Sequence, residues 1–404
     1  MAIETLLADR LFDGTGAAAI DKAFVQFENG LITAVGRQSD LGSKASEALD
    51  LGNATLLPGL INMHTHLTCS AGTHVLQEAL HDSFETKMMR AVENARRSVL
   101  SGVTTIRDCG TLNPIVFAIR EGSKEEIITA PHVWASGEVL TSTGGHCYFF
   151  GVECDSIEDI KKAVRAQVKA GADYIKVMAT GGGLTPNTNP REAQFGREEM
   201  IALVQDSQRI GKRVAAHCHG TPGIVNAIAA EVTTIEHCSF MVPDGVEYEQ
   251  PLADSIAEKG IYVCPTIGVG ERFRQHAERE GIELPAGMAQ TRPKRIDNFR
   301  KLLDSGVKFV SGNDAGMTFT GFDDFQLDLE MLVEYVGMSN ADAIMTATGQ
   351  AAEAIGSDEF GTLQVGRRAD ILGVRGDALQ DIGALRDLLL VKKSGKTMVD
   401  NLPA

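Results

Sequence analysis

The feature that most restricts the fold is an alternation of short apolar runs with amphipathic, helix-like stretches from Leu56 onward. The apolar runs end in polar residues or glycine and suit a parallel sheet buried on both faces. Eight strands are expected, at residues 60–66, 103–108, 133–137, 174–179, 214–219, 233–237, 262–266 and 308–314. Eight strand–helix alternations predict an α/β fold, a (β/α)8 TIM barrel. An open doubly wound sheet is the alternative, but the sequence has no GxGxxG turn where such a sheet would need one to bind a nucleotide.

The two ends of the chain carry a different pattern, in which short strands are separated by turns. Asn29-Gly30 lies between two strand-like runs and predicts a hairpin. Glycines punctuate the segment after Phe360 in a similar way. Because neither end is long enough to make its own core, we predict that they pair. The prediction is a small discontinuous β-sandwich domain from residues 1–56 and 358–404, with a barrel domain over 57–357.

Charge and composition limit the partners that this protein can bind and the compartment in which it works. With 38 basic against 54 acidic residues, the net charge of −16 would repel nucleic acid, and no apolar run is long enough to cross a membrane. The seven cysteines form no CxxC pair, which favours a reduced compartment over a disulfide framework. The first residues do not read as a secretory signal. We therefore expect a cytoplasmic location, with a mature exported form left open, and a homo-oligomer that acts on a small molecule.

Histidines gather at the ends of the expected strands, where barrel enzymes place their chemistry. His64 and His66 are two residues apart in one strand, so both imidazoles can point to the same side. Three further strands end in residues of the same chemical kind: His217 and His219, His237, and Asp314. Imidazole and carboxylate are suitable ligands for zinc and related divalent ions. The pattern therefore predicts a metal site at the barrel mouth.

Lys176 is the one charged residue inside the apolar run Tyr174–Met178. An unpaired ammonium buried there would be costly. Two explanations are open: an ion pair with a nearby carboxylate, or carboxylation by carbon dioxide, which would turn the cation into an anionic ligand that bridges two metals.

Together these residues resemble the amidohydrolase superfamily of metal-dependent hydrolases. Within it, they resemble the branch of prolidase-like dipeptidases, Xaa-Arg carboxypeptidases and ochratoxin-type amidases. The motifs are Leu57–His66, Ile175–Gly182, His217–Gly220, Glu236-His237 and Gly361–Asp370. The resemblance implies two divalent metal ions, most simply zinc. It assigns one ion to His64, His66 and Asp314, the other to His217 and His237, and the bridge to N-carboxylated Lys176.

The resemblance also implies roles for three side chains around the metals. A hydroxide bridging the two ions would attack an amide carbonyl, and Asp314 would act as general base and then general acid. His219 would contact the substrate and stabilise the oxyanion rather than bind metal. His146, in the Thr143–His146 segment, would bind the carbonyl or carboxylate of the substrate. The expected enzyme is a binuclear amidohydrolase of the peptidase or amidase type.

The substrate is less restricted by the sequence. A dipeptide ending in proline or a hydrophobic residue, or an N-acyl amino acid including ochratoxin-like amides, is the first expectation. Arg272 and Arg274 offer partners for a carboxylate, or belong to a solvated helix face, and residues 181–190 could form a lid. A hydrolase of ureas, carbamates or cyclic amides is the alternative, and a non-catalytic metal-binding module is a third. A one-metal deaminase fits poorly, because a single ion needs no bridging carbamate.

Overall fold

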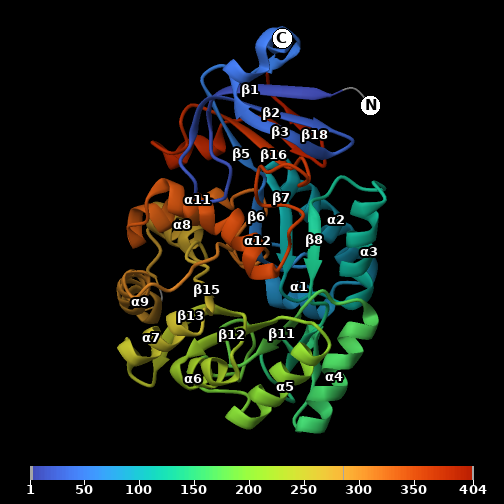
Figure 1. Cartoon of the computed structure of the whole chain (residues 1–404). Coiled ribbons are helices and arrows are strands. Elements are labelled where there is room, and N and C mark those ends of the chain that lie inside the picture. The colour runs from blue at the N-terminus through green and yellow to red at the C-terminus, as the bar shows by residue number, and fades with distance from the viewer. Residues whose placement is uncertain (1–2, 285, 403–404) are drawn as a thin grey trace.

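The computed structural model describes residues 3–284 and 286–402. Both chain ends, blue and red in Figure 1, form a layer of strands above the helices and strands contributed by the middle of the chain. This is an α/β fold. The side chains of residues 43–46 and 286–290 are outside the description.

The strands from the two chain ends form one eight-stranded sheet in the order β18-β17-β16-β5-β1-β2-β3, with β4 paired to β1. The N-terminal strands are β1 (Glu4–Leu11), β2 (Ile20–Glu28), β3 (Leu31–Arg37), β4 (Leu49–Asp50) and β5 (Ala54–Pro58). The C-terminal strands are β16 (Ile371–Arg375), β17 (Leu388–Lys393) and β18 (Lys396–Asp400). The predicted hairpin is present, with Asn29 and Gly30 both at positive φ between β2 and β3.

All of these strands belong to one hydrogen-bonded network. The reason is β5, which pairs in parallel with β1 and antiparallel with β16, so that the two ends of the chain share one hydrogen-bonded network. The sequence did indicate that the ends associate. It did not indicate β17, which lies between β16 and β18.

Seven of the eight strands expected in the middle of the chain are present. They are β6 (Leu60–Thr65), β7 (Val103–Asp108), β8 (His132–Ala135), β11 (Ile175–Met178), β12 (Val214–Gly220), β13 (Thr234–Val242) and β15 (Tyr262–Cys264). β6, β7 and β8 pair in parallel, as do β11, β12, β13 and β15. Three short additional strands are β9 (Val139–Thr141), β10 (Gly151–Glu153) and β14 (Gly245–Val246).

The eighth expected strand, residues 308–314, is not a regular strand and pairs with its neighbours through isolated bridges. Phe309 bridges in parallel to Val263, and Ala315 bridges in parallel to Thr65. Gly312 packs so closely on β6 that an added Cβ would lie 2.5 Å from the His64 nitrogen, and Asp314 leaves the extended conformation at a φ of 59°. The segment thus lies between β15 and β6 without being a regular strand.

Helices follow most of these strands and cover their outer side (Figure 1). They are α1 (Val75–His81), α2 (Phe84–Leu100), α3 (Asn113–Lys124), α4 (Ile157–Ala170), α5 (Arg197–Arg209), α6 (Thr221–Ala230), α7 (Gln250–Glu258), α8 (Glu271–Glu280), α9 (Ala286–Asp304), α10 (Gln326–Met331), α11 (Asn340–Thr346) and α12 (Gly349–Ile355). α4 shows why the boundaries fall where they do. The Ser156 side chain accepts from the Asp159 nitrogen at its start, and Gly171 ends it at a φ of 113°.

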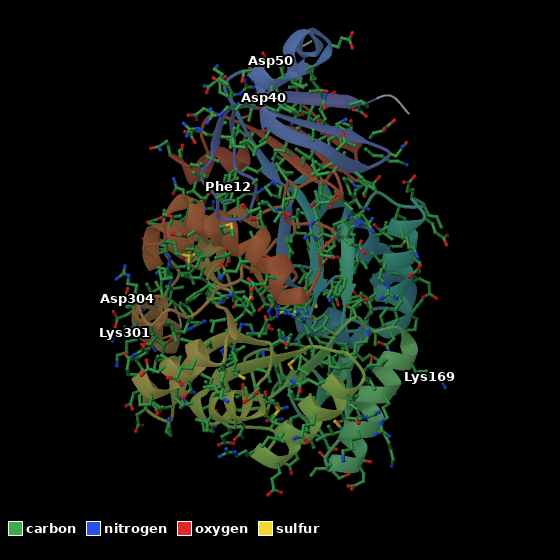
Figure 2. The ribbon with its side chains drawn as sticks, viewed as in Figure 1. Phe12, Asp40, Asp50, Lys169, Lys301 and Asp304 are labelled. Carbon is green, nitrogen blue, oxygen red and sulfur yellow. The ribbon has the colours of Figure 1, made fainter. Side chains whose placement is uncertain are left out.

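The largest core lies between these helices and the parallel strands and includes Phe12, the residue that follows β1. Figure 2 shows Phe12 at the junction of the terminal sheet with the rest of the fold, whereas Lys169, Lys301 and Asp304 project outward from helices. All seven cysteines are buried and unpaired. Among residues 3–284 and 286–402, no helix combines the length and apolar character needed to span a membrane.

Candidate metal centre

The C-terminal ends of the parallel strands surround a cavity of about 420 Å³. Every metal-site residue expected from the sequence lines it, together with both expected substrate contacts: His64, His66, His146, Lys176, His217, His219, His237 and Asp314. These residues come from six separate segments, because the carboxyl ends of neighbouring parallel strands meet at one edge. The tertiary fold therefore brings all of them together.

His64, His66 and Asp314 form the first group, with one ligand atom of each within 4.8 Å of the others. Asp314 Oδ1 lies 3.6 Å from His64 Nε2 and 3.1 Å from His66 Nε2. The opposite ring nitrogens are engaged elsewhere. His64 Nδ1 is 2.8 Å from Glu236 Oε2, and His66 Nδ1 donates to the Gly110 carbonyl at 3.2 Å. Such bonds fix the ring orientation and leave both Nε2 atoms facing the cavity.

His217, His219 and His237 form the second group, again within 4.8 Å of one another. His237 Nδ1 is 2.7 Å from Thr266 Oγ1, and His219 Nδ1 is 2.8 Å from Ser239 Oγ. The sequence analysis assigned His217 and His237 to a metal ion and His219 to the substrate. In the structure its ring stacks on that of His237 at 4.6 Å, so it belongs to the same cluster by position.

Lys176 lies on β11 with 1% of its surface exposed, and its Nζ has no hydrogen-bond partner in the described part of the chain. No carboxylate of the described residues forms an ion pair with it. Of the two explanations for this buried lysine, the ion pair is therefore absent. The amine of Lys176 has no partner within the described ranges and lies on the cavity wall among imidazoles and a carboxylate. Carboxylation of this amine would give a carbamate able to bridge two metal ions. The donor set thus fits two divalent ions.

Burial sets the charge of these groups. It lowers the pKa of His64 to about 4 and that of His219 to about 3, so both imidazoles are neutral near pH 7. Burial raises the pKa of Asp314, but interactions with His64, His66 and Lys176 outweigh it and bring the pKa to about 2. Neutral imidazole and ionised carboxylate are the forms that bind metal.

His146 reaches the cavity from the segment between β9 and β10. Its Nδ1 lies 3.1 Å from Thr185 Oγ1, and its ring is 4.7 Å from that of His217. Gly182 approaches so closely that an added Cβ would lie 2.4 Å from the imidazole. The loop of residues 181–190, expected as a lid, therefore holds His146 in position and contributes Leu184 to the cavity wall.

Two residues that position the site received no role from the sequence. Glu236 is fully buried on β13 and accepts from Arg107 Nη2 at 2.7 Å in addition to contacting His64. Arg107 is a charged residue inside the buried strand β7. The signal that singled out Lys176, a charge within an apolar run, would also have identified Arg107.

The two arginines considered for a substrate carboxylate are engaged elsewhere. Arg272 Nη2 donates to Asp324 at 2.8 Å, and Arg274 pairs with Glu271 at 2.6 Å. Neither lines the histidine cavity. The surface-helix interpretation of these residues is therefore the better one, because nearby carboxylates already neutralise both.

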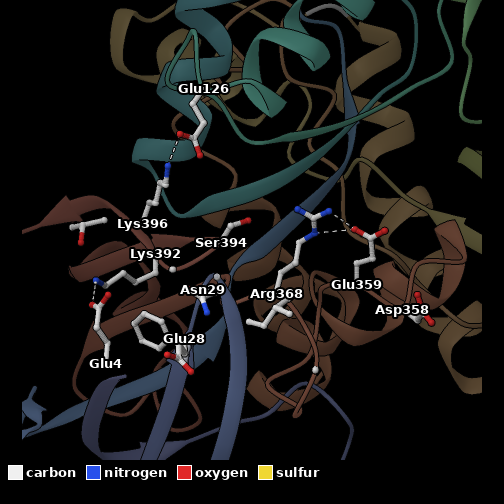
Figure 3. Close-up of a pocket in the computed structure, with 16 residues that line it drawn as sticks. Glu4, Glu28, Asn29, Glu126, Asp358, Glu359, Arg368, Lys392, Ser394 and Lys396 are labelled. Carbon is white, nitrogen blue, oxygen red and sulfur yellow. Dashed lines mark hydrogen bonds and ion pairs between the residues drawn. The ribbon is translucent and has the colours of Figure 1, made fainter. Parts of the chain in front are cut away.

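A larger groove of about 980 Å³ lies beside the terminal sheet (Figure 3). Its basic side chains all face acids: Lys392 Nζ is 2.8 Å from Glu4, Arg368 Nε is 2.8 Å from Glu359, and Lys396 contacts Glu126. It contains no histidine. Size alone therefore does not mark the functional site, and the smaller histidine cavity is the better candidate.

Comparison with known proteins agrees with this site. A sequence model of the amidohydrolase family matches residues 55–399. Ochratoxinase of Aspergillus niger is 27% identical over 95% of this chain and 84% of its own length, and its crystal structure superposes with a TM-score of 0.86 over 98% and 96% of the two chains. A Xaa-Pro dipeptidase crystallised with methionine in its active site gives a TM-score of 0.86 at 28% identity, over 98% and 99%. Imidazolonepropionase of Geobacillus kaustophilus is 24% identical over 87% of this chain and 84% of its own length.

Proposed function

The chain belongs to the amidohydrolase family, and from this premise we propose that it is a binuclear metal-dependent hydrolase that cleaves an amide bond. The observation that carries the proposal is the meeting of two histidine-containing ligand groups around the unpartnered Lys176 in one cavity. Neither a thiolate site nor a serine nucleophile is needed.

His64, His66 and Asp314 would hold one ion, His217 and His237 the other, and carboxylated Lys176 would bridge them. Zinc suits this set of nitrogen and oxygen donors. When bound, the two ions supply an activated water and polarise the scissile carbonyl.

The remaining chemistry belongs to the chain's own side chains. Asp314 is ionised and faces the cavity, so it accepts the proton of the attacking water and returns it to the departing amine nitrogen. His219 and His146 orient the substrate carbonyl, since both are held by hydroxyl groups through Nδ1. The products are one carboxylic acid and one amine.

The proposed substrates are dipeptides ending in proline or a hydrophobic residue, and N-acyl amino acids including ochratoxin-like amides. The names of two relatives, ochratoxinase and a Xaa-Pro dipeptidase, support this choice. The deciding experiment is a screen of Xaa-Pro, Xaa-Arg and N-acyl amino acid libraries beside aryl ureas. Turnover of ureas alone would favour the alternative chemistry. Inactivity of metal-loaded protein on every compound would favour a binding module.

Metal analysis tests the centre itself. Reconstitution with zinc and bicarbonate should give close to two ions per chain, and a value of one would count against the bridge. The Asp314→Asn variant should lose turnover while some metal stays bound. Retained turnover would refute the proton-transfer role of Asp314.

We also propose that the parallel strands close into a (β/α)8 barrel over residues 57–357, beside a terminal domain of residues 1–56 and 358–404. Support comes from the 308–314 segment: the Val263 nitrogen donates to the Lys308 carbonyl at 2.9 Å, and the Met63 nitrogen donates to the Ser311 carbonyl at 2.9 Å. The Asp173 nitrogen likewise donates to the Ala135 carbonyl, between β8 and β11. A cytoplasmic homo-oligomer completes the proposal, and light scattering would test the assembly.

A further inference from the structure

Arg295, on α9, borders the histidine cavity and a second cavity of about 500 Å³. Its Nε is buried and has no hydrogen-bond partner among the side chains that the structure describes. Within residues 3–284 and 286–402 it forms no ion pair. Arg295 as a whole is half-buried, but a guanidinium with its Nε buried and no counter-ion is costly and calls for an explanation.

The surrounding charges do not supply that counter-ion. The buried acid Glu271 already has two partners: it accepts from Arg274 at 2.6 Å and from Arg292 at 2.8 Å. Arg292 also lies over the Tyr335 ring, 4.9 Å from its centroid. Burial, followed by repulsion from Arg292, lowers the pKa of Arg295 to about 10, which keeps it charged at neutral pH. Two arginines thus share one carboxylate, and Arg295 stays uncompensated.

The second cavity has the character of a side-chain pocket. It shares Val269, Gly270 and Arg295 with the histidine cavity, so the two adjoin at Arg295. Its other walls include the apolar residues Met241, Ile267, Ile296 and Phe299. Three further arginines, Arg191, Arg274 and Arg292, also line this cavity. A molecule that extends from the histidines past Arg295 would therefore meet first that cation and then a wall that is partly apolar and partly basic.

We propose that Arg295 binds the carboxylate of the substrate's amine half and that the second cavity takes the apolar side chain beside it. The inference rests on the proposed function. It narrows the substrate to an amide whose leaving group is a hydrophobic α-amino acid with a free carboxylate. Arg295 and His219 line the same cavity, so the carboxylate and the scissile carbonyl must be close together in the substrate. In an N-acyl amino acid they are separated by only the amide nitrogen and the α-carbon.

The test compares two substrates with the same scissile bond, N-benzoyl-L-phenylalanine and N-benzoyl-L-phenylalaninol, in zinc-loaded protein. Arg295→Met should lower kcat/KM for the carboxylate about tenfold to a hundredfold relative to the alcohol. Arg295→Lys should lose less. Arg272→Met, at an arginine outside both cavities, should leave the ratio unchanged. An equal loss on both substrates in Arg295→Met would overturn the assignment.

A binding measurement separates this inference from the proposed function. Calorimetry of metal-free protein should show L-phenylalanine binding more tightly than L-phenylalaninol, and Arg295→Met should abolish the difference. If the metal-loaded wild type cleaves none of the library compounds and neither benzoyl compound but shows this binding, the hydrolase proposal fails and the carboxylate site stands. If metal-free wild type does not discriminate between the two ligands, the carboxylate site fails.

The apolar cavity is tested by size. Met241→Trp should shift the preference of the enzyme from N-benzoyl-L-phenylalanine toward N-benzoylglycine by filling the space for the side chain. An unchanged preference would overturn this part of the assignment.

Discussion

Replacing Glu236 by glutamine is the sharpest test of how this fold holds its site. The carboxylate is fully buried, contacts His64 Nδ1 at 2.8 Å and accepts from Arg107 at 2.7 Å. Glutamine keeps the shape but removes the charge, which leaves the Arg107 guanidinium buried without its counter-ion. Breaking such a pair costs about 3–5 kcal/mol. That is a large share of the roughly 5–15 kcal/mol by which domains are stable.

The assay is urea unfolding of metal-free protein, so that the loss of metal affinity does not contribute. Glu353→Gln is the matched control, since Glu353 pairs with Lys308 at 3.0 Å on the surface, where both side chains are about half exposed. Its effect should stay below about 1 kcal/mol. An Arg107→Met, Glu236→Gln double variant should be more stable than the sum of the single effects predicts. A change below about 1 kcal/mol in Glu236→Gln would refute the reasoning.

The same variant also tests the site. Because Glu236 fixes the His64 ring, zinc affinity should fall about tenfold to a hundredfold. Competition with a chromophoric chelator measures this directly, and wild-type affinity would show that His64 needs no such support.

Three other predictions use the same reasoning. Lys176→Met should lose the second zinc ion. In metal-free protein the same variant should raise the urea midpoint, because it removes an unpartnered buried ammonium, and a lowered midpoint would contradict this. Gly182→Ala should destabilise by about 1–3 kcal/mol because the new Cβ meets the His146 ring, whereas Gly183→Ala, with open space, should not; equal effects would show that the loop gives way. Asp328 is buried, which raises its pKa to about 7. Between about pH 4 and pH 7 the folded state therefore keeps a proton that the unfolded state releases. The stabilisation that the protonated Asp328 provides is lost as pH rises through this range. Asp328→Asn should flatten the fall in melting temperature over that range, and an unchanged slope would assign the fall to other groups.

The sequence was most informative where a pattern is local. Apolar runs of strand length, each followed by helical spacing, located seven strands within a few residues. The two-residue period of a strand placed His64 and His66 on one side, and a charge within an apolar run singled out Lys176. These inferences need only neighbours along the chain.

Tertiary structure decided what depends on contacts between distant segments. The single terminal sheet arises because β5 pairs with strands from both ends of the chain. Gly312 packs closely on His64 in the eighth segment and Asp314 adopts a left-handed φ of 59°, neither of which local propensity registers.

The charged residues make the same point. Arg272, Arg274 and Arg295 look alike in the sequence, but acids from the fold neutralise the first two and leave the third uncompensated beside the cavity. The sequence by itself determined which residue types meet at the strand ends. Only the tertiary structure decided which charges remain free, because burial and the partner of each charge are set by segments far apart in the chain.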